Sequence, residues 1–166
     1  MNEIFVRRSI RTFKNEKVSS DKIDRVLRAA MQAPSAKNQQ PWYFVVIDDA
    51  ETLADIRKIR GGSKPLFTAP VVIVLAFGPN LKAASRVQQD MGCATQNLML
   101  EAVSLGLGTI WIGTYPDEET MDEVRKVTNM PSDYSPYAVI GVGYPLGDEN
   151  KFLDRYNEER IRYNKW

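Results

Sequence analysis

The chain has 166 residues, a formal net charge of +1 and 43% apolar residues. This length fits one domain with a sizeable core, and the composition is that of a folded, water-soluble protein. The small net charge gives no global reason to expect a nucleic-acid partner. The single cysteine excludes an internal disulfide, and the absence of histidine excludes Ser-His and Cys-His catalysis and the common zinc sites. Whatever chemistry occurs here must be supplied by a bound group.

The opening segment MNEIFVRRSI has no apolar stretch of the kind that an export signal needs, and no apolar run approaches the roughly 18 residues of a membrane span. A single cysteine fits a reducing compartment. We therefore expect a cytoplasmic protein without a membrane partner. We interpret RGGSK at residues 60–64 as a mobile loop rather than a domain boundary, so residues 1–166 are expected to form a single domain.

Hydrophobic periodicity predicts helices that alternate with apolar strands. The runs WYFVVI and PVVIVLAF are continuous and rich in β-branched residues, which is typical of buried strands. In chain order, the predicted elements are a short helix at 2–8, a helix from Ser19 or Ser20 to Pro34, a strand at 42–47, a helix at 49–59, a strand at 70–77, a helix at 81–105, a strand at 109–112, a helix at 117–127 and a strand at 138–142. This pattern favours an α+β sandwich whose sheet is covered on both faces.

The tail at residues 148–166 differs from the rest of the chain. It carries five acids and five bases, interspersed with aromatic residues such as Phe152, Tyr156 and Trp166. A charged segment with so many large apolar side chains is expected to dock on a protein surface, and the surface of a partner subunit is one candidate.

The segment RRSIR at residues 7–11 places three guanidinium groups and a hydroxyl within five positions. Arginine can grip a phosphate or another oxyanion with two parallel hydrogen bonds, so the segment is a candidate anion site. Taken alone, the spacing fits an ordinary solvated basic helix end better.

The segment APSAKNQQPW at residues 33–42 concentrates hydroxyl and amide side chains between a predicted helix and a predicted strand. Such side chains suit a ligand that presents donors and acceptors on a planar edge. The alternative is a connecting loop whose side chains satisfy its own backbone.

Two glycine-containing segments lie at predicted strands. GLGTIWIGTYP at residues 106–116 allows close approach to the main chain, and GVGYP at 141–145 closes the last strand similarly. Neither has the GxGxxG spacing, so we do not predict a dinucleotide-binding fold. Ordinary tight turns remain the alternative for both.

Several other residues are interpreted as structural. Cys93 lies between two small residues in a predicted helix, which favours a packing role over a reactive thiol. Met91, Met99 and Met121 occupy positions typical of a helix core. The acids at 117–119 begin a helix, where negative charge interacts favourably with the helix dipole.

Taken in order, these segments resemble the FMN-dependent nitroreductase family, and the resemblance spans nearly the whole chain. The matching segments are RRSIR at 7–11, APSAKNQQPW at 33–42, DMG at 90–92 with the long helix after it, GLGTIWIG at 106–113, GVGYP at 141–145 and the tail from D154-R155 to N164-K165-W166. The conjunction is far more specific than any single segment.

The resemblance implies an α+β homodimer with a central mixed sheet flanked by helices. Two FMN sites would lie at the subunit interface, each built from both chains, with the C-terminal tail reaching the partner subunit. NAD(P)H and a small-molecule electron acceptor would be its further partners.

The resemblance also implies roles for residues at the phosphate end of FMN. Arg7, Arg8 and Ser9 correspond to ligands of the phosphate and of nearby ribityl oxygens. Arg155 corresponds to a cation from the tail on the same phosphate. Arg11 corresponds to the position that reaches the N1 and O2 edge of the isoalloxazine ring.

Other residues are implied at the ring itself. Ile112 and Gly113 would place main chain beside its N5 and O4 edge. The residues that would come from the other subunit are Pro34, Ser35, Ala36 and Asn38.

The expected activity is transfer of electrons from NAD(P)H by a ping-pong mechanism to a planar electrophile such as a nitroaromatic or a quinone. The flavin performs hydride transfer, so neither histidine nor cysteine is required. A permanent cation at Arg11 would stabilise the reduced flavin anion. An alternative is a protein that stores or senses FMN with little turnover. A basic nucleic-acid-binding module at residues 7–28 fits poorly, because the net charge is small and no recognisable motif is present.

The sequence departs from the family pattern in two places. Ala36 stands where many relatives have a second serine, which removes one hydroxyl from the loop. The stretch between Gly113 and Tyr137 leaves little room for the long helical insertions of larger relatives, so an open site is expected.

Overall fold

Seven consecutive apolar residues form β2 (Val71–Phe77), and all of them are buried, as the sequence predicts for a central strand. The computed structural model of the chain describes residues 2–60 and 64–166, so most of the RGGSK segment lies outside the described residues. The other strands are β1 (Trp42–Ile47), β3 (Gly108–Gly113) and β4 (Ser135–Gly143), and the sheet order is β1-β2-β4-β3.

All three strand pairs in this sheet are antiparallel, so the prediction of a mixed sheet is wrong for the described strands. Apolar runs indicate that strands are buried, but they do not determine strand direction. Here, helical connections return the chain so that each strand runs against its neighbour.

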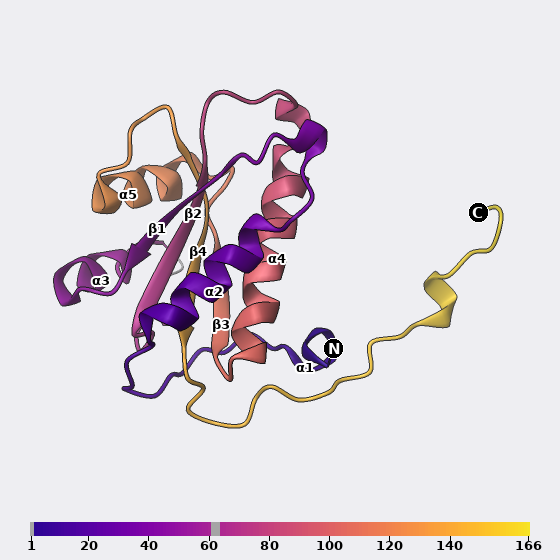
Figure 1. The fold of residues 1–166 in the computed structure, drawn as a ribbon, viewed down its shortest axis with the longest axis horizontal. Helices are drawn as coiled ribbons and strands as arrows, with labels where there is room; N and C mark the ends of the chain where they lie inside the picture. The colour runs from indigo at the N-terminus through magenta and orange to yellow at the C-terminus, as the bar shows by residue number, and fades with distance from the viewer. Residues whose placement is uncertain (1, 61–63) are drawn as a thin grey trace.

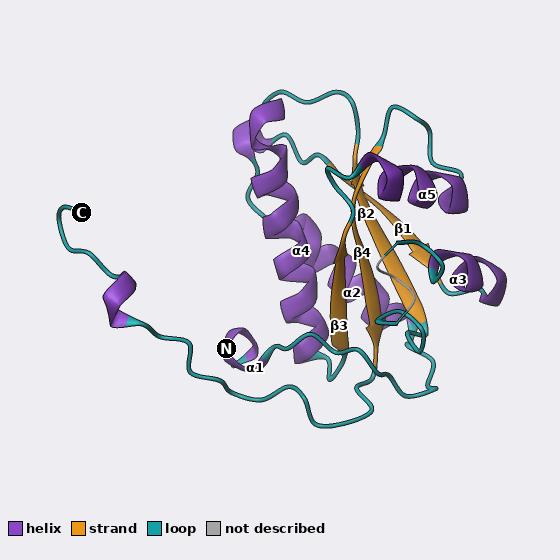
Figure 2. Ribbon diagram, turned by 180° about the vertical axis from the view of Figure 1, so that it is seen from behind, coloured by secondary structure: helices purple, strands orange, loops and turns teal. Residues whose placement is uncertain are grey.

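Helices cover both faces of the sheet, as predicted (Figure 1, Figure 2). On one face lie α2 (Ser20–Met31) and α4 (Val87–Ser104), and on the other lie α3 (Ala50–Ile56) and α5 (Glu118–Thr128). Successive side chains of a strand point to opposite faces. Ile73 and Leu75 accordingly pack in the core beneath α2 and α4, whereas Val72 and Val74 pack in the second core.

Aspartates cap the N-termini of α3 and α5, the helices on the second face of the sheet. Asp49 accepts a hydrogen bond from the backbone N–H of Thr52, and Asp117 accepts one from Thr120, both at 2.8 Å. These hydrogen bonds hold the pKa of each carboxyl below its ordinary value. The acids therefore cap helices, and the structural interpretation of Asp117 is confirmed.

The long helix begins later than predicted. A 3₁₀ turn at Ala84–Arg86 precedes α4, which starts at Val87 rather than at residue 81. Both main-chain polar groups of Ala83 are hydrogen-bonded to the side chain of Gln39, at 2.9 and 3.2 Å. Ala83 is therefore tied to the 33–42 loop, and the helix begins only after it.

The segment after the first helix, α1 (Glu3–Val6), is fastened to the beginning of β3. Ser9 forms a parallel bridge with Thr109, and the N–H of Ile10 donates to the Thr109 carbonyl at 2.9 Å. A Cβ on Gly108 would lie 2.4 Å from Cγ1 of the buried Ile10. The missing side chain at Gly108 therefore permits this close contact.

The tail extends away from the rest of the chain, with a 3₁₀ turn at Glu158–Arg160 (Figure 1). Most of its side chains are exposed, and Trp166 is fully exposed. The beginning of the tail docks on its own subunit, where residues 152–156 line a hollow together with residues of α1 and of the segment that follows it. Docking of the tail on a partner subunit stays a prediction.

Candidate functional site

Two adjacent arginines and a third from the distant tail converge on one hollow. Arg7 and Arg8 from the end of α1 and Arg155 from the tail line a cavity of about 260 Å³. Its remaining lining is partly apolar, and the rings of Phe5 and Phe152 lie 6.3 Å apart. The other lining residues are Ile4, Leu153, Asp154 and Tyr156.

The charges of this arginine cluster are held together against their mutual repulsion. Burial lowers the pKa of the Arg7 guanidinium below its ordinary value, and the nearby charges of Arg155 and Arg8 lower it further. Asp154 lines the same hollow, but its carboxylate accepts a hydrogen bond from the N–H of Tyr156 at 2.9 Å. An anion that entered the hollow would relieve the repulsion.

Arg8 also has an unsatisfied donor. Its Nη1 donates to the carbonyls of Arg7 and Phe5 at 2.7 and 3.3 Å, and its backbone N–H donates to Oδ1 of Asn150 at 3.1 Å. Its Nη2 is buried and has no hydrogen-bond partner among the described residues. Buried guanidinium donors are usually paired, so this atom fits a site for an additional acceptor.

Arg11 does not join the hollow. Its side chain is exposed and donates only a long hydrogen bond, 3.3 Å, to the carbonyl of Ser9. Because Ser9 pairs with Thr109, Arg11 lies near the beginning of β3, whereas Gly113 lies at its end. Four residues of strand separate Thr109 from Gly113 by roughly 13 Å, so the two predicted ring contacts mark opposite ends of β3.

Aromatic rings gather near the end of β3. Trp111 lies 5.9 Å from Tyr137, which lies 6.5 Å from Tyr115, measured between ring centroids. Burial, with a smaller effect of the neighbouring Cys93, raises the pKa of the Tyr137 phenol. Gly113 is exposed and Ile112 is half-buried, so main-chain groups at this strand end are accessible beside a partly apolar surface.

The 33–42 loop has an uncommon backbone. Lys37, Asn38 and Gln40 all have positive φ, between 46° and 53°. Ser35 Oγ accepts a hydrogen bond from the Gln40 N–H at 3.0 Å, and the Gln40 amide donates to the Asn38 side chain at 2.9 Å. Part of the loop thus satisfies its own polar groups. This agrees with the alternative interpretation of the segment as a connecting loop whose side chains bond to its own backbone.

The same loop is anchored on α4. Asp90 accepts hydrogen bonds from the N–H of Ala36 at 3.0 Å and from the side-chain amide of Gln39 at 2.6 Å. Sequence reasoning noted the DMG segment but assigned no role to Asp90. The contact spans more than fifty positions, and a single acid near the start of a helix carries no signal for it.

The arginine cluster and the loop occupy different ends of α4 within one protomer. The loop contacts Asp90, whereas α1 shares a hollow with Leu100, Glu101 and Ser104 near the end of the helix. Eleven helical residues, from 90 to 101, span roughly 16 Å. One protomer therefore does not bring Ser35, Ala36 and Asn38, or the exposed Pro34 beside them, together with the arginines.

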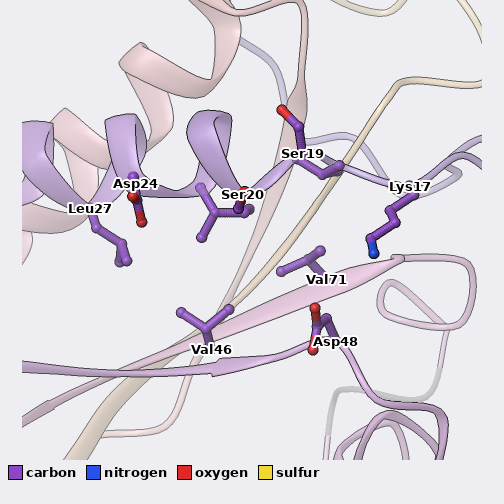
Figure 3. A pocket seen from close by; sticks show the side chains of 10 residues that line it. Lys17, Ser19, Ser20, Asp24, Leu27, Val46, Asp48 and Val71 are labelled. Carbon is purple, nitrogen blue, oxygen red and sulfur yellow. The ribbon is translucent and has the colours of Figure 1, made fainter.

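A hollow of about 620 Å³ lies elsewhere, between the start of α2 and the edge strand β1 (Figure 3). Val46 and Val71 contribute apolar surface, with Lys17 and Asp48 at one end. None of its lining residues is a predicted cofactor contact, so its size does not make it part of the site.

Other sequence interpretations have mixed outcomes. Met91, Met99 and Met121 are buried as predicted. Cys93 is exposed, so the predicted packing role is not met within the single protomer. The small neighbouring residues do not reveal this exposure.

Comparisons with known proteins agree with this geometry. The sequence profile of the nitroreductase family matches residues 4–63 and 57–144. The chain belongs to the nitroreductase family. An Archaeoglobus fulgidus relative, named NADH dehydrogenase/NAD(P)H nitroreductase, is 38% identical over 98% of this chain and 96% of its own length.

Solved structures of similar proteins show the same fold. A Clostridium acetobutylicum protein named NADH oxidase is 44% identical, with a TM-score of 0.95 and 99% of both chains covered. An FMN-dependent nitroreductase from Clostridium difficile is 31% identical, with a TM-score of 0.90 and 99% of both chains covered. The α+β fold and the family inferred from the sequence motifs are therefore confirmed.

In the described part of this nitroreductase-family chain, no helix is long and apolar enough to cross a membrane. Residues 2–60 and 64–166 also contain no cluster of three or more histidine, cysteine or acidic side chains that could hold a metal ion.

We predict that Arg155→Gln will separate anion binding from stability. Removing this charge relieves repulsion on Arg7, so the free energy of unfolding without ligand should not fall. Inorganic phosphate should raise the melting temperature of the wild type by a few degrees more than chloride of equal ionic strength, and the variant should lose most of that rise. Differential scanning calorimetry measures both effects.

The matched control is Arg160→Gln, which removes the same charge from an exposed tail position that does not line the hollow. It should keep the phosphate response. A full response in Arg155→Gln, or its loss in both variants, would show that the arginine cluster is not an anion site.

Proposed function

We propose that this nitroreductase-family chain is an FMN-dependent oxidoreductase. It passes electrons from NAD(P)H to a small planar electrophile, such as a nitroaromatic or a quinone, by a ping-pong mechanism. The observation that carries the proposal is the convergence of Arg7, Arg8 and Arg155 on one hollow in a chain of this family. A similar protein of known structure is described as an FMN-dependent nitroreductase.

The arginine cluster fits the phosphate of FMN. The buried, unsatisfied Nη2 of Arg8 favours an acceptor oxygen. Burial, and then the charges of Arg155 and Arg8, lower the pKa of Arg7, and a multiply charged oxyanion would offset both effects. Ser9, which follows directly, offers an exposed hydroxyl for the neighbouring ribityl oxygens. These residues would hold the cofactor by its anionic end.

When bound, FMN supplies hydride transfer, which accounts for a chain without histidine. Arg11 contributes a permanent positive charge near the N1 and O2 edge of the ring and favours the reduced, anionic state. Main-chain groups of Ile112 and Gly113 would lie beside the N5 and O4 edge. The aromatic rings near Gly113 offer a flat, partly apolar surface for planar substrates.

We propose that two copies of the chain complete each site. Pro34, Ser35, Ala36 and Asn38 would act on the flavin of the other copy. In their own copy the loop is anchored at Asp90, whereas α1 shares a hollow with Glu101, and these two positions lie roughly 16 Å apart along α4. The exposed tail would dock on the partner subunit and keep Arg155 at the phosphate. The lone cysteine fits action of this homodimer in the cytoplasm.

The test of function starts from protein reconstituted with FMN. Anaerobic mixing with NADH and, separately, with NADPH should bleach the flavin absorption band within seconds. Addition of a nitroaromatic or a quinone should restore it. A yellow protein that neither nucleotide reduces would support FMN storage or sensing instead. A colourless protein after incubation with excess FMN would contradict the cofactor assignment itself.

We predict that Arg11→Ala will impair reduction without unfolding the chain. Loss of the fixed cation should lower the two-electron reduction potential by roughly 30 mV. A tenfold change in the equilibrium constant of a two-electron couple corresponds to about that value. Hydride uptake should slow about tenfold or more. Potentiometric titration and anaerobic stopped-flow spectroscopy measure these quantities.

Lys14→Ala is the control, because it removes an exposed cation from the same segment. Its potential and rate should match those of the wild type. Unchanged values in Arg11→Ala would remove Arg11 from its proposed role.

We predict that truncation before Asp154 will weaken FMN retention and dimerisation together, because the tail supplies both Arg155 and the apolar docking residues. Light scattering and the flavin-to-protein ratio after gel filtration measure the two effects. Full-length Arg155→Gln should lose affinity for FMN but remain dimeric. A truncated chain that still purifies as a yellow dimer would contradict this role of the tail.

A further inference from the structure

Asp90 is a buried acid, and only 5% of its surface is exposed. One carboxylate oxygen accepts the N–H of Ala36, and the other accepts the side-chain amide of Gln39. A buried carboxylate is costly unless donors satisfy it, so these bonds keep α4 and the 33–42 loop together.

Gln39 is held in one orientation by its partners. Its Nε2 donates to Asp90 at 2.6 Å and to the carbonyl of Ala83 at 3.2 Å. Its Oε1 accepts the N–H of Ala83 at 2.9 Å. Rotation of the amide would place donor against donor and acceptor against acceptor, so the side chain forms a fixed link between the loop and the segment before α4.

These anchors flank two of the three residues with positive φ in the loop. Lys37 and Asn38 have positive φ, and they lie between Ala36 and Gln39. Left-handed backbone at residues other than glycine is unfavourable and persists where the surroundings impose it. Asp90 bonds to both flanking residues, which is the arrangement that imposes this conformation on the loop.

We propose that Asp90 is a positioning residue for the cofactor site. It acts through Ala36 and Gln39 and holds the loop in the shape that contacts FMN bound by the other copy. This inference rests on the function proposed above. Asp90 itself touches no cofactor, since its carboxylate is occupied by the loop.

The chemistry of the contact permits a test by exchange of donor and acceptor. In Asp90→Asn, the new amide keeps an acceptor for Ala36 but presents a donor to the donor of Gln39. Gln39→Glu alone brings two carboxylates together. In the double variant, the amide introduced at position 90 can donate to the carboxylate introduced at position 39. This restores the link with its direction reversed and removes only the hydrogen bond from residue 39 to the carbonyl of Ala83, which still accepts the N–H of Arg86.

The experiment compares these three variants with the wild type as full-length protein. FMN dissociation constants come from fluorescence titration, and amide hydrogen exchange reports the loop at residues 36–40 with and without FMN. Each single variant should raise the dissociation constant about tenfold or more, because hydrogen bonds to charged groups are strong. Exchange in the loop should accelerate. The double variant should recover to within about threefold of the wild type.

Thr95→Val is the matched control. Thr95 is buried one turn further along α4, and its hydroxyl donates only to the carbonyl of Met91, within the helix. The change should leave FMN affinity and loop exchange unchanged. A general weakening of α4 would affect this control as well, whereas a positioning role would not.

Wild-type affinity in Asp90→Asn, or a double variant no better than the worse single variant, would overturn the inference. If Asp90→Asn does not fold, Gln39→Met supplies the second test, because it removes the link but leaves the bond between Asp90 and Ala36. Gln39→Met should raise the dissociation constant, and wild-type affinity would again overturn the inference. Failure of the wild type itself to bind FMN would instead contradict the proposed function.

Discussion

Electrostatic repulsion among three arginines is the constraint around which the functional end of this molecule is organised. Arg7 and Arg8 are adjacent in the chain, and Arg155 from the tail lines the same hollow. Burial, and after it the charges of Arg155 and Arg8, lower the pKa of Arg7, as expected where cations meet in a partly buried hollow. A protein keeps like charges together when an oppositely charged ligand restores the balance.

Helix α4 determines how the parts of the site are distributed. It supports α1 near one end and the 33–42 loop near the other, and it does so across 18 residues of regular helix. A rigid helix keeps these groups apart in one copy. An interface that places the second copy against the first is a direct way to combine them, and the exposed tail is consistent with such an arrangement.

Most of the fold follows from local patterns. The apolar run of β2 predicted a strand buried on both faces, because no alternation leaves a polar side. Asp117 ahead of an amphipathic segment predicted a capped helix start. The strand direction was not predictable in this way, since pairing depends on how distant connections return the chain. The exposure of Cys93 was also not predicted, because small neighbouring residues do not indicate how far a helix position is covered by the rest of the fold.

The sequence by itself determined the elements, the α+β class, the family and the residues most suited to hold an anionic cofactor, because these depend on composition, periodicity and short motifs. The family resemblance implied that Arg155 shares an anion with Arg7 and Arg8, and the tertiary structure brings the three to one hollow. Only the tertiary structure decided that Arg11 lies near the beginning of β3 and Gly113 at its end, and that Asp90 anchors the loop. Those facts depend on contacts between residues far apart in the chain. Such contacts are set when helices and strands pack together, and no local pattern encodes their geometry.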